Sequence, residues 1–214
     1  MVFKGWLRIV ALFGLLLAAA MSPAIAEPVK IVGFGDSLMA GYELAPDEGF
    51  TAQLQHALRN DDLDVVVVNA GVSGDTTSGG LSRLDWSVPD DTDLVILELG
   101  ANDALRGIQP AITRKNLEEM IVRLKDRGIP VLLAGMLAPP NMGDNYAADF
   151  NPIYPDLAKK YELPLYPFFL EGVAAHPVLQ LGDGMHPNPE GVKRMVEGIR
   201  PLIRPMIEAI QAEK

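Results

Sequence analysis

The stretch "VKIVGFGDSLMAG", residues 29–41, joins an apolar run to a glycine-rich turn and a helix-like segment. Dinucleotide-binding folds begin this way, and so do hydrolases that carry a nucleophile at a strand-to-helix turn. The dinucleotide fingerprint G-x-G-x-x-G would start at Gly33, but its third glycine is replaced by Leu38. The nucleophile elbow G-x-S-x-G around Ser37 would need a glycine where Met39 stands. What remains is a serine just past a parallel-type strand, and its partners must come from elsewhere in the chain.

Residues 1–26 are expected to form a secretory signal peptide rather than part of the fold. Two basic residues precede an uncharged apolar run at 9–21, and "AIA" at 24–26 fits the small-x-small cleavage rule. A membrane anchor is the alternative, but the run is short for a bilayer span of about 20 residues. Cleavage after Ala26 predicts a periplasmic or secreted protein without an obligatory membrane anchor. Residues 27–214 are then expected to form one domain.

Charge and cysteine content exclude several classes of protein. The chain has 18 Lys and Arg against 28 Asp and Glu, a net charge of −10, so nucleic acid and anionic membrane surfaces should repel it. The absence of cysteine excludes disulfides, thiolate metal sites and cysteine nucleophiles. No histidine spacing is typical of zinc, and the acidic pairs lack the spacing of a calcium loop. We therefore expect no metal, no cofactor and no nucleic-acid partner.

Strand-like and helix-like stretches alternate along the chain. Apolar runs that favour strands lie at Lys30–Phe34, Asp64–Asn69, Asp93–Leu99, Pro130–Leu137 and, more weakly, Leu165–Phe168. They are continuous rather than alternating, as in parallel strands that helices cover on both faces. Helical patterns occur at 48–60, 113–128 and 188–211, the last expected to bend or break near Pro201 and Pro205. This alternation predicts an α/β sandwich.

Polar residues follow the predicted strands, at the edge of the sheet where α/β proteins bind ligands. They occupy 35–37, 69–71 and 100–103, and a further set, 183–187, precedes the last helix. Ser37 can attack a carbonyl, His186 can take its proton, and Asp183 can hold the imidazole in the right tautomer. The resulting oxyanion needs donors placed in advance. The N–H groups of Ser37 and Gly71 and the side-chain amide of Asn102 would suit this role, and Gly71 has no side chain to block the approach.

Four sequence blocks occur in a characteristic order. They are "GFGDSLMAG" at 33–41, "NAGVSGDTT" at 69–77, "ELGANDALRG" at 98–107 and "GDGMHPN" at 182–188. With these blocks the chain resembles the SGNH, or GDSL, hydrolase superfamily, and within it the bacterial thioesterase I, lysophospholipase L1 and arylesterase group. The resemblance implies a three-layer, flavodoxin-like α/β/α sandwich with a five-stranded parallel sheet. It also implies Ser37 as nucleophile, His186 and Asp183 as base and orienter, and an oxyanion hole of Ser37, Gly71 and Asn102.

The implied function is hydrolysis of small carboxylic esters and thioesters through an acyl-enzyme, by a protein for which a monomer is favoured. A carbohydrate O-deacetylase on the same fold is the alternative, and a non-catalytic binding protein is disfavoured because the four blocks keep their functional residues. Close relatives often have glycine where Ala101 stands, and Ala101 and Ala104 are expected to narrow the pocket. Polar loops at 72–80 and 138–146 favour a shallow groove for short to medium acyl chains.

Other polar residues are expected to have ordinary roles. Ser73 imitates a nucleophile elbow, but the last glycine of that motif is missing. Asp103 is expected to be structural, and Asp36 to bind local backbone rather than react. His56 lies in a helical pattern and His176 in a proline-containing loop, and both are expected to be non-catalytic.

Overall fold

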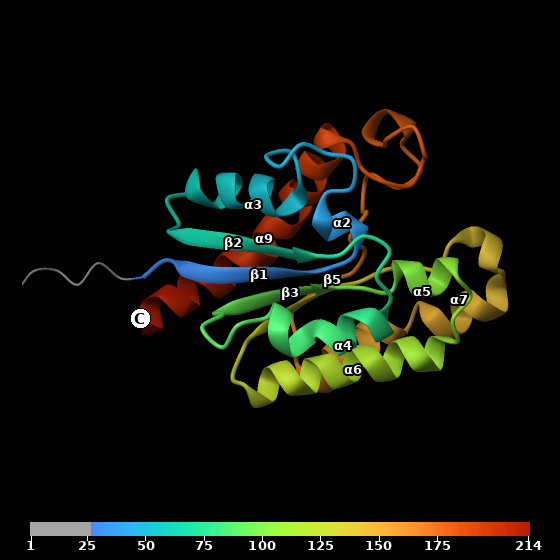
Figure 1. The fold of residues 1–214 in the computed structure, drawn as a ribbon, viewed down its shortest axis with the longest axis horizontal. Helices are drawn as coiled ribbons and strands as arrows, with labels where there is room; N and C mark the ends of the chain where they lie inside the picture. Colours follow the sequence, from blue (N-terminus) through green and yellow to red (C-terminus); the bar gives the residue numbers. More distant parts are fainter. Residues whose placement is uncertain (1–26) are drawn as a thin grey trace, which may run out of the picture.

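The computed structural model describes residues 27–214, and the expected signal peptide lies outside the described residues. Five parallel strands form one sheet in the order β2-β1-β3-β4-β5. The strands are β1 Val29–Gly35, β2 Val65–Gly71, β3 Leu94–Glu98, β4 Val131–Ala134 and β5 Leu165–Tyr166. The predicted α/β architecture with a five-stranded parallel sheet is confirmed (Figure 1).

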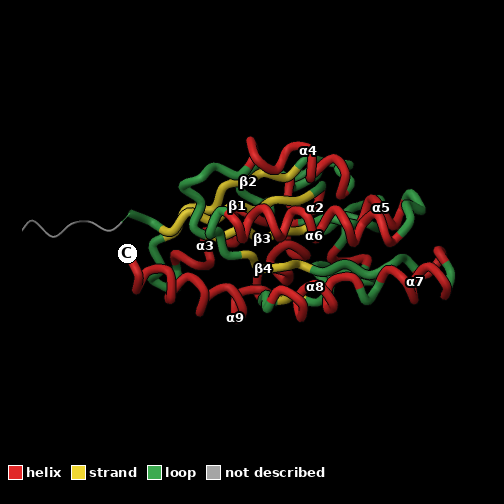
Figure 2. The backbone as a smooth tube through the Cα atoms, turned by 90° about the horizontal axis from the view of Figure 1, so that it is seen from below, coloured by secondary structure: helices red, strands yellow, loops and turns green. Residues whose placement is uncertain are grey.

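Helices cover both faces of this sheet. They are α2 Ser37–Ala40, α3 Phe50–Arg59, α4 Thr77–Ser87, α5 Ala101–Leu105, α6 Pro110–Asp126, α7 Asp144–Phe150, α8 Ile153–Tyr161 and α9 Pro189–Glu213, with 3-10 turns η1 Pro140–Met142 and η2 Pro177–Leu179. Helices α3 and α9 pack together on one side, and α4 and α6 on the other (Figure 1). Seen from below, α4, α6 and α8 follow one another across the sheet (Figure 2). The helices thus form the two outer layers of a three-layer α/β/α sandwich.

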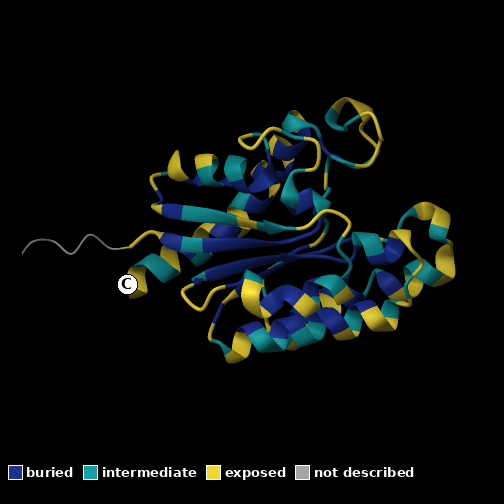
Figure 3. Cartoon of the chain, in the orientation of Figure 1, coloured by how far each residue is buried: buried dark blue, intermediate teal, exposed yellow. Residues whose placement is uncertain are grey.

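The central strands are buried, whereas the edge strand β2 is not. Every residue of β3 and β4 is buried, and β1 is buried except for Lys30, as the dark-blue strands of Figure 3 show. In β2 only Val65 is fully buried. The prediction that this run is covered on both faces is therefore wrong. Because β2 has a neighbouring strand on one side only, its outer part remains accessible to solvent.

Helix α9 runs without interruption through both of its inner prolines. Pro201 and Pro205 are exposed, while Ile199, Ile203 and Ile207 are buried against the core. The carbonyls that the prolines leave without a donor can therefore be hydrated, and the buried isoleucine face holds the helix together. The expected break does not occur. Between residues 27 and 214, no helix combines the length and apolarity needed to cross a membrane.

Helices α4, α5, α7 and α8 were not predicted. Gly79 and Gly80 weaken the helical pattern of α4, since glycine is a poor helix former. A Cβ at Gly80 would collide with the side chain of Leu99, so this glycine lets α4 lie close against the end of β3. The stretch 138–146, expected to be a loop, contains η1 and the start of α7. In α4 this close packing, which the local pattern does not reveal, explains the glycine.

Candidate active site

Ser37, His186 and Asp183 form one chain of hydrogen bonds at the carboxyl edge of the sheet. Ser37 is the first residue of α2, directly after β1, whereas His186 lies in the loop before α9. The His186 Nε2 atom is 2.9 Å from Ser37 Oγ. The Nδ1 atom of the same ring is 2.5 Å from Asp183 Oδ2. The fold thus brings together three side chains that the sequence placed in two distant blocks.

Asp183 is held in place by its own loop. Its Oδ1 atom accepts the backbone N–H groups of Met185 at 2.9 Å and His186 at 3.0 Å. The Met185 N–H, followed by the imidazole and the His186 N–H, lowers the pKa of Asp183 to about 2. Asp183 is therefore an anion at neutral pH, and its Oδ2 atom contacts the imidazole ring. Gly184 makes the tight turn possible, with φ at +69°.

An aromatic ring that sequence reasoning did not single out lies against His186. The ring centroids of Tyr42 and His186 are 4.4 Å apart, with an angle of 33° between the planes. Tyr42 follows the left-handed Gly41 at the end of α2, and its N–H donates to the carbonyl of Ser37 at 3.2 Å. Its position five residues after Ser37 gives no signal of this contact, because only the tertiary fold brings the loop of His186 over it.

Asp36 connects Asn102 to the serine turn. The Asn102 Nδ2 group donates to Asp36 Oδ2 at 3.1 Å, and the Leu38 N–H donates to Asp36 Oδ1 at 3.0 Å. The expected bond to local backbone is thus present, together with an unexpected bond that orients the Asn102 amide. Asp36 is fully buried, and this burial raises its pKa to about 6. An amide carries two N–H bonds, so Asn102 keeps a second donor for other partners.

A second buried carboxyl group lies behind Asp36. Glu98, the last residue of β3, accepts the Asp36 N–H through Oε2 at 3.1 Å. Its Oε1 has no hydrogen-bond partner among the described residues. Burial, and then the charge of Asp36, raise the pKa of Glu98 well above its usual value. Asp36 accepts two hydrogen bonds through its carboxylate and Glu98 only one, so the charged form is less stabilised at Glu98 than at Asp36.

The structure gives the Gly71 N–H a partner other than a substrate. It donates to Asn69 Oδ1 at 2.9 Å, so this part of the predicted oxyanion hole is already occupied. A Cβ at Gly71 would meet the backbone of Met39 and Ala40, which means that α2, rather than a substrate, requires glycine here. Three residues further on, Gly74 has φ at +80°, and its N–H donates no hydrogen bond within residues 27–214. Sequence reasoning passed over this second glycine.

The remaining polar residues lie outside the hydrogen-bonded chain. Ser73, His56 and His176 are exposed, and none of them bonds to Ser37 or His186. Asp103 is buried and accepts hydrogen bonds from Thr77 and Thr113, which is the structural role expected of it. Ala104 is fully buried in the core. The prediction that its side chain narrows the pocket is therefore wrong.

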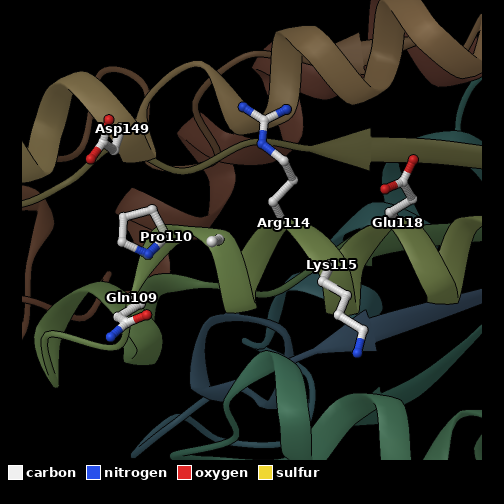
Figure 4. A pocket seen from close by; sticks show the side chains of 7 residues that line it. Gln109, Pro110, Arg114, Lys115, Glu118 and Asp149 are labelled. Atoms are coloured by element: carbon white, nitrogen blue, oxygen red, sulfur yellow. The ribbon is translucent and has the colours of Figure 1, made fainter.

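One hollow lies away from these residues. It has a volume of about 620 Å³ and is lined by Gln109, Pro110, Ala111, Arg114, Lys115, Glu118 and Asp149. In Figure 4 the charged side chains of Arg114, Lys115 and Glu118 project from α6, and they carry both signs of charge. Nothing there resembles an aligned nucleophile. Within residues 27–214, no three His, Asp or Glu side chains gather as metal ligands would.

The fold and this hydrogen-bonded chain together define a serine hydrolase of the α/β class. The model of the GDSL-like lipase/acylhydrolase family matches residues 34–194. An arylesterase of Vibrio mimicus is 42% identical over 182 residues, 85% of this chain and 91% of that protein. Thioesterase 1/protease 1/lysophospholipase L1 of Escherichia coli (strain K12) is 34% identical over 196 residues, 91% of this chain and 92% of that protein.

Solved structures agree with these relatives. The crystal structure of AlinE4, an SGNH-hydrolase family esterase, is 46% identical and has a TM-score of 0.72. It covers 85% of this chain and 97% of its own. The chain belongs to the GDSL-like lipase/acylhydrolase family and is a serine hydrolase that acts on esters. The resemblance found in the sequence is thereby confirmed.

Proposed function

We propose that this hydrolase cleaves carboxylic esters and thioesters through a covalent acyl-enzyme on Ser37. The hydrogen-bonded chain from Ser37 through His186 to Asp183 carries the proposal. His186 Nε2 takes the proton from Oγ as Oγ attacks the carbonyl carbon, and the imidazolium then protonates the departing alkoxide or thiolate. Water repeats the sequence on the acyl-enzyme and releases the acid. Asp183, whose pKa is about 2, stays ionised and stabilises the imidazolium.

The oxyanion hole in this proposal consists of the Ser37 N–H, the second N–H of the Asn102 amide and the Gly74 N–H. Ser37 is the first residue of α2, where a helix leaves its N–H without an internal acceptor. Asp36 holds the Asn102 amide at 3.1 Å, so the donor is oriented before substrate binds. Gly74 replaces Gly71, whose N–H is bonded to Asn69. Donors of this kind stabilise the tetrahedral oxyanion because they need no reorganisation during the reaction.

The site is open, which supports small acyl substrates. The side chains of His186 and Asp183 are 17% and 31% exposed, and Val72, Leu137 and Met185 are apolar and exposed on neighbouring segments. Each buried methylene contributes at most about 0.8 kcal/mol. An open surface gains from the first few carbons and little from later ones. Short to medium acyl chains with good leaving groups are therefore the proposed substrates, aryl esters and thioesters among them.

The location of the protein is a further part of the proposal. A basic start, an apolar run and the "AIA" cleavage pattern at 24–26 support export and removal of residues 1–26. The mature chain would then be a periplasmic or secreted domain, 27–214, acting as a monomer. Mass spectrometry of the protein isolated from the cell envelope fraction tests this proposal. A mature chain that begins at Glu27 is expected, and an intact Met1 would contradict export with cleavage.

Two measurements test the proposed chemistry. With p-nitrophenyl acetate, a burst of p-nitrophenol equal to the enzyme concentration is expected if deacylation is slower than acylation. A phosphonate inhibitor should add covalently to Ser37, as located by peptide mass spectrometry. Label on Ser73 or Ser78 would contradict the assignment. A series of p-nitrophenyl esters and acyl thioesters of increasing length tests the substrate, and a steady rise in kcat/KM to the longest chain would contradict the open-site proposal.

A further inference from the structure

One buried arginine bonds three separate segments behind the hydrogen-bonded chain. The side chain of Arg83, on α4, is only 7% exposed. Its Nη2 group donates to the carbonyl of Gly35 at 2.8 Å, and Nη1 to the carbonyl of Ala70 at 2.8 Å. Its Nε group donates to Asp75 Oδ2 at 2.6 Å. The guanidinium also lies 4.1 Å above the ring of Phe34, so both its face and its edge are engaged.

The three segments are those on which the proposed chemistry depends. Gly35 ends β1, two residues before Ser37. The Asp75 N–H donates to the carbonyl of Val72 at 3.1 Å and closes a turn, 72–75, whose third residue is Gly74. A positive φ at that position is what a type II turn requires. Arg83 therefore joins the strand that carries the serine to the turn that carries the Gly74 N–H.

Stability alone is a poor explanation for this contact. A buried ion pair is often no better for stability than apolar side chains of similar volume, because both charges lose their hydration. The residues around the Arg83–Asp75 pair nevertheless accommodate it, because a side chain at Gly79 would collide with the Asp75 carboxylate. A planar fork of fixed donors is the property that arginine has and lysine lacks. The fork serves acceptors on three other segments, and Nη1 also donates to Ser87 Oγ on α4 itself at 3.3 Å.

We propose that Arg83 is a positioning residue, which sets the distance and angle between Ser37 Oγ and the N–H of Gly74. This inference rests on the proposed function, because it concerns the same oxyanion hole. Arg83 itself touches no substrate and transfers no proton. Its effect should therefore appear where the oxyanion forms, in kcat, and not in the initial binding of a neutral ester.

Arg83→Lys is the variant that tests the proposal, because it keeps the charge and removes the fork. A small misplacement of reacting groups costs roughly 10²-fold in rate, so kcat for p-nitrophenyl acetate should fall by about that factor while KM changes little. A trifluoromethyl ketone forms a charged hemiketal with the serine, and its Ki should rise in parallel with the loss of kcat. Asp75→Asn weakens only the bond from Arg83 to the turn. It should lower kcat and raise the Ki of the ketone in the same way, but by a smaller factor.

Arg59→Lys is the matched control. The Arg59 Nε group donates to the carbonyl of Val65 at 3.0 Å, which is the same kind of contact at the opposite end of β2. This variant should keep kcat, KM and Ki. Circular dichroism establishes the folded fraction of each variant, and kinetic constants are compared per folded enzyme. If Arg83→Lys does not fold, the kinetics of Asp75→Asn test the proposal instead.

The outcomes separate the two proposals. An active wild-type enzyme with unchanged kcat in Arg83→Lys would overturn the positioning role alone. So would a loss of kcat without a change in the hemiketal Ki, or an equal loss in Arg59→Lys. A wild-type protein that hydrolyses no ester would overturn the proposed function and, with it, this inference.

Discussion

The two ends of the sheet carry charge in different ways. At the amino ends of the strands, Lys30 pairs with Asp91 and Lys214 with Asp93, and these side chains reach solvent. At the carboxyl ends, Arg83, Asp36 and Glu98 are buried. Exposed pairs contribute little because water and salt screen them. Buried charges are costly unless every group is bonded. The carboxyl end therefore retains an arrangement that stability alone does not favour, which fits the proposed role of Arg83 in positioning the site.

The largest loss of activity is expected from a substitution at the carboxyl end of the sheet, at Ser37. Ser37→Ala removes the proposed nucleophile and should lower kcat by several powers of ten, with about 10⁶ as the scale for such a residue. The fold should be unaffected, because the Ser37 side chain contacts the site and not the core. Turnover of p-nitrophenyl acetate and thermal unfolding measure the two properties. Hydrolysis at the wild-type rate would show that another residue attacks the ester.

Asn102→Ala should give the next largest loss. Removing one donor from an oxyanion hole costs about 10²–10³ in kcat, with little change in KM. The substitution also leaves Asp36 Oδ2 without its amide partner. Steady-state kinetics on one ester measures the effect, and Asn116→Ala, which removes an amide bonded to Thr77 and Ser78, serves as a control for general loosening. A drop of less than about tenfold would mean that Asn102 is not a donor in the transition state.

The hydrogen-bonded chain could be found from sequence, but what supports it could not. Ser37 was predicted because it directly follows a buried strand, where α/β proteins bind ligands. Asp183 and His186 were predicted because they lie three residues apart in a polar loop before the last helix. Tyr42 and Arg83 were missed because each reaches the site across a tertiary contact. The sequence signal for Arg83 would have been an arginine on the buried side of a helix. That helix, α4, was not predicted because its two glycines weaken the helical pattern. Local pattern therefore predicts reacting residues at strand ends better than the residues that position them.

Gly71 shows why spacing alone does not decide which backbone N–H serves a substrate. A glycine at a strand end can donate its N–H to a substrate, or it can allow a neighbouring segment to pack closely. The sequence does not distinguish these two roles. Here the approach of α2 and the bond to Asn69 account for Gly71, while the Gly74 N–H donates no hydrogen bond among the residues that the structure describes. The direction of a peptide N–H depends on the turn that carries it, and turn geometry emerges only when the strands are assembled.

The buried carboxyl pair should make stability depend on pH. Folded Asp36 has a pKa of about 6, and the pKa of Glu98 is raised further above its unfolded value. Both groups hold protons more tightly in the folded state, so their contribution is complete below the unfolded pKa values. It is lost as the pH rises from about 4 through 6 and beyond, at about 1.4 kcal/mol for each unit of difference. Glu98→Gln should flatten this decline, as measured by urea unfolding between pH 4 and 8. An unchanged slope would show that Glu98 does not titrate in this range.

Tyr42 should have a smaller effect, because it supports His186 without reacting. Aromatic contacts contribute about 0.5–1.5 kcal/mol, so Tyr42→Ala should lower kcat by roughly two- to tenfold. Tyr42→Phe keeps the ring and should retain most of the activity. Both variants are compared by kcat on p-nitrophenyl acetate. Equal losses in both variants would assign the role to the hydroxyl group instead of the ring.

The smallest effect is expected at the amino end of the sheet, and it completes the comparison. Asp91→Asn removes the partner that Lys30 Nζ contacts at 2.8 Å, and the bond to Lys30 is what lowers the pKa of Asp91. The Asp91 side chain is 73% exposed, so water replaces the lysine at little cost. Neither kcat nor the melting temperature should change measurably at moderate salt. The same exchange of charge for amide in Asp75→Asn, at the buried pair with Arg83, should alter both. Similar losses at the two positions would mean that burial does not distinguish the ends of this sheet.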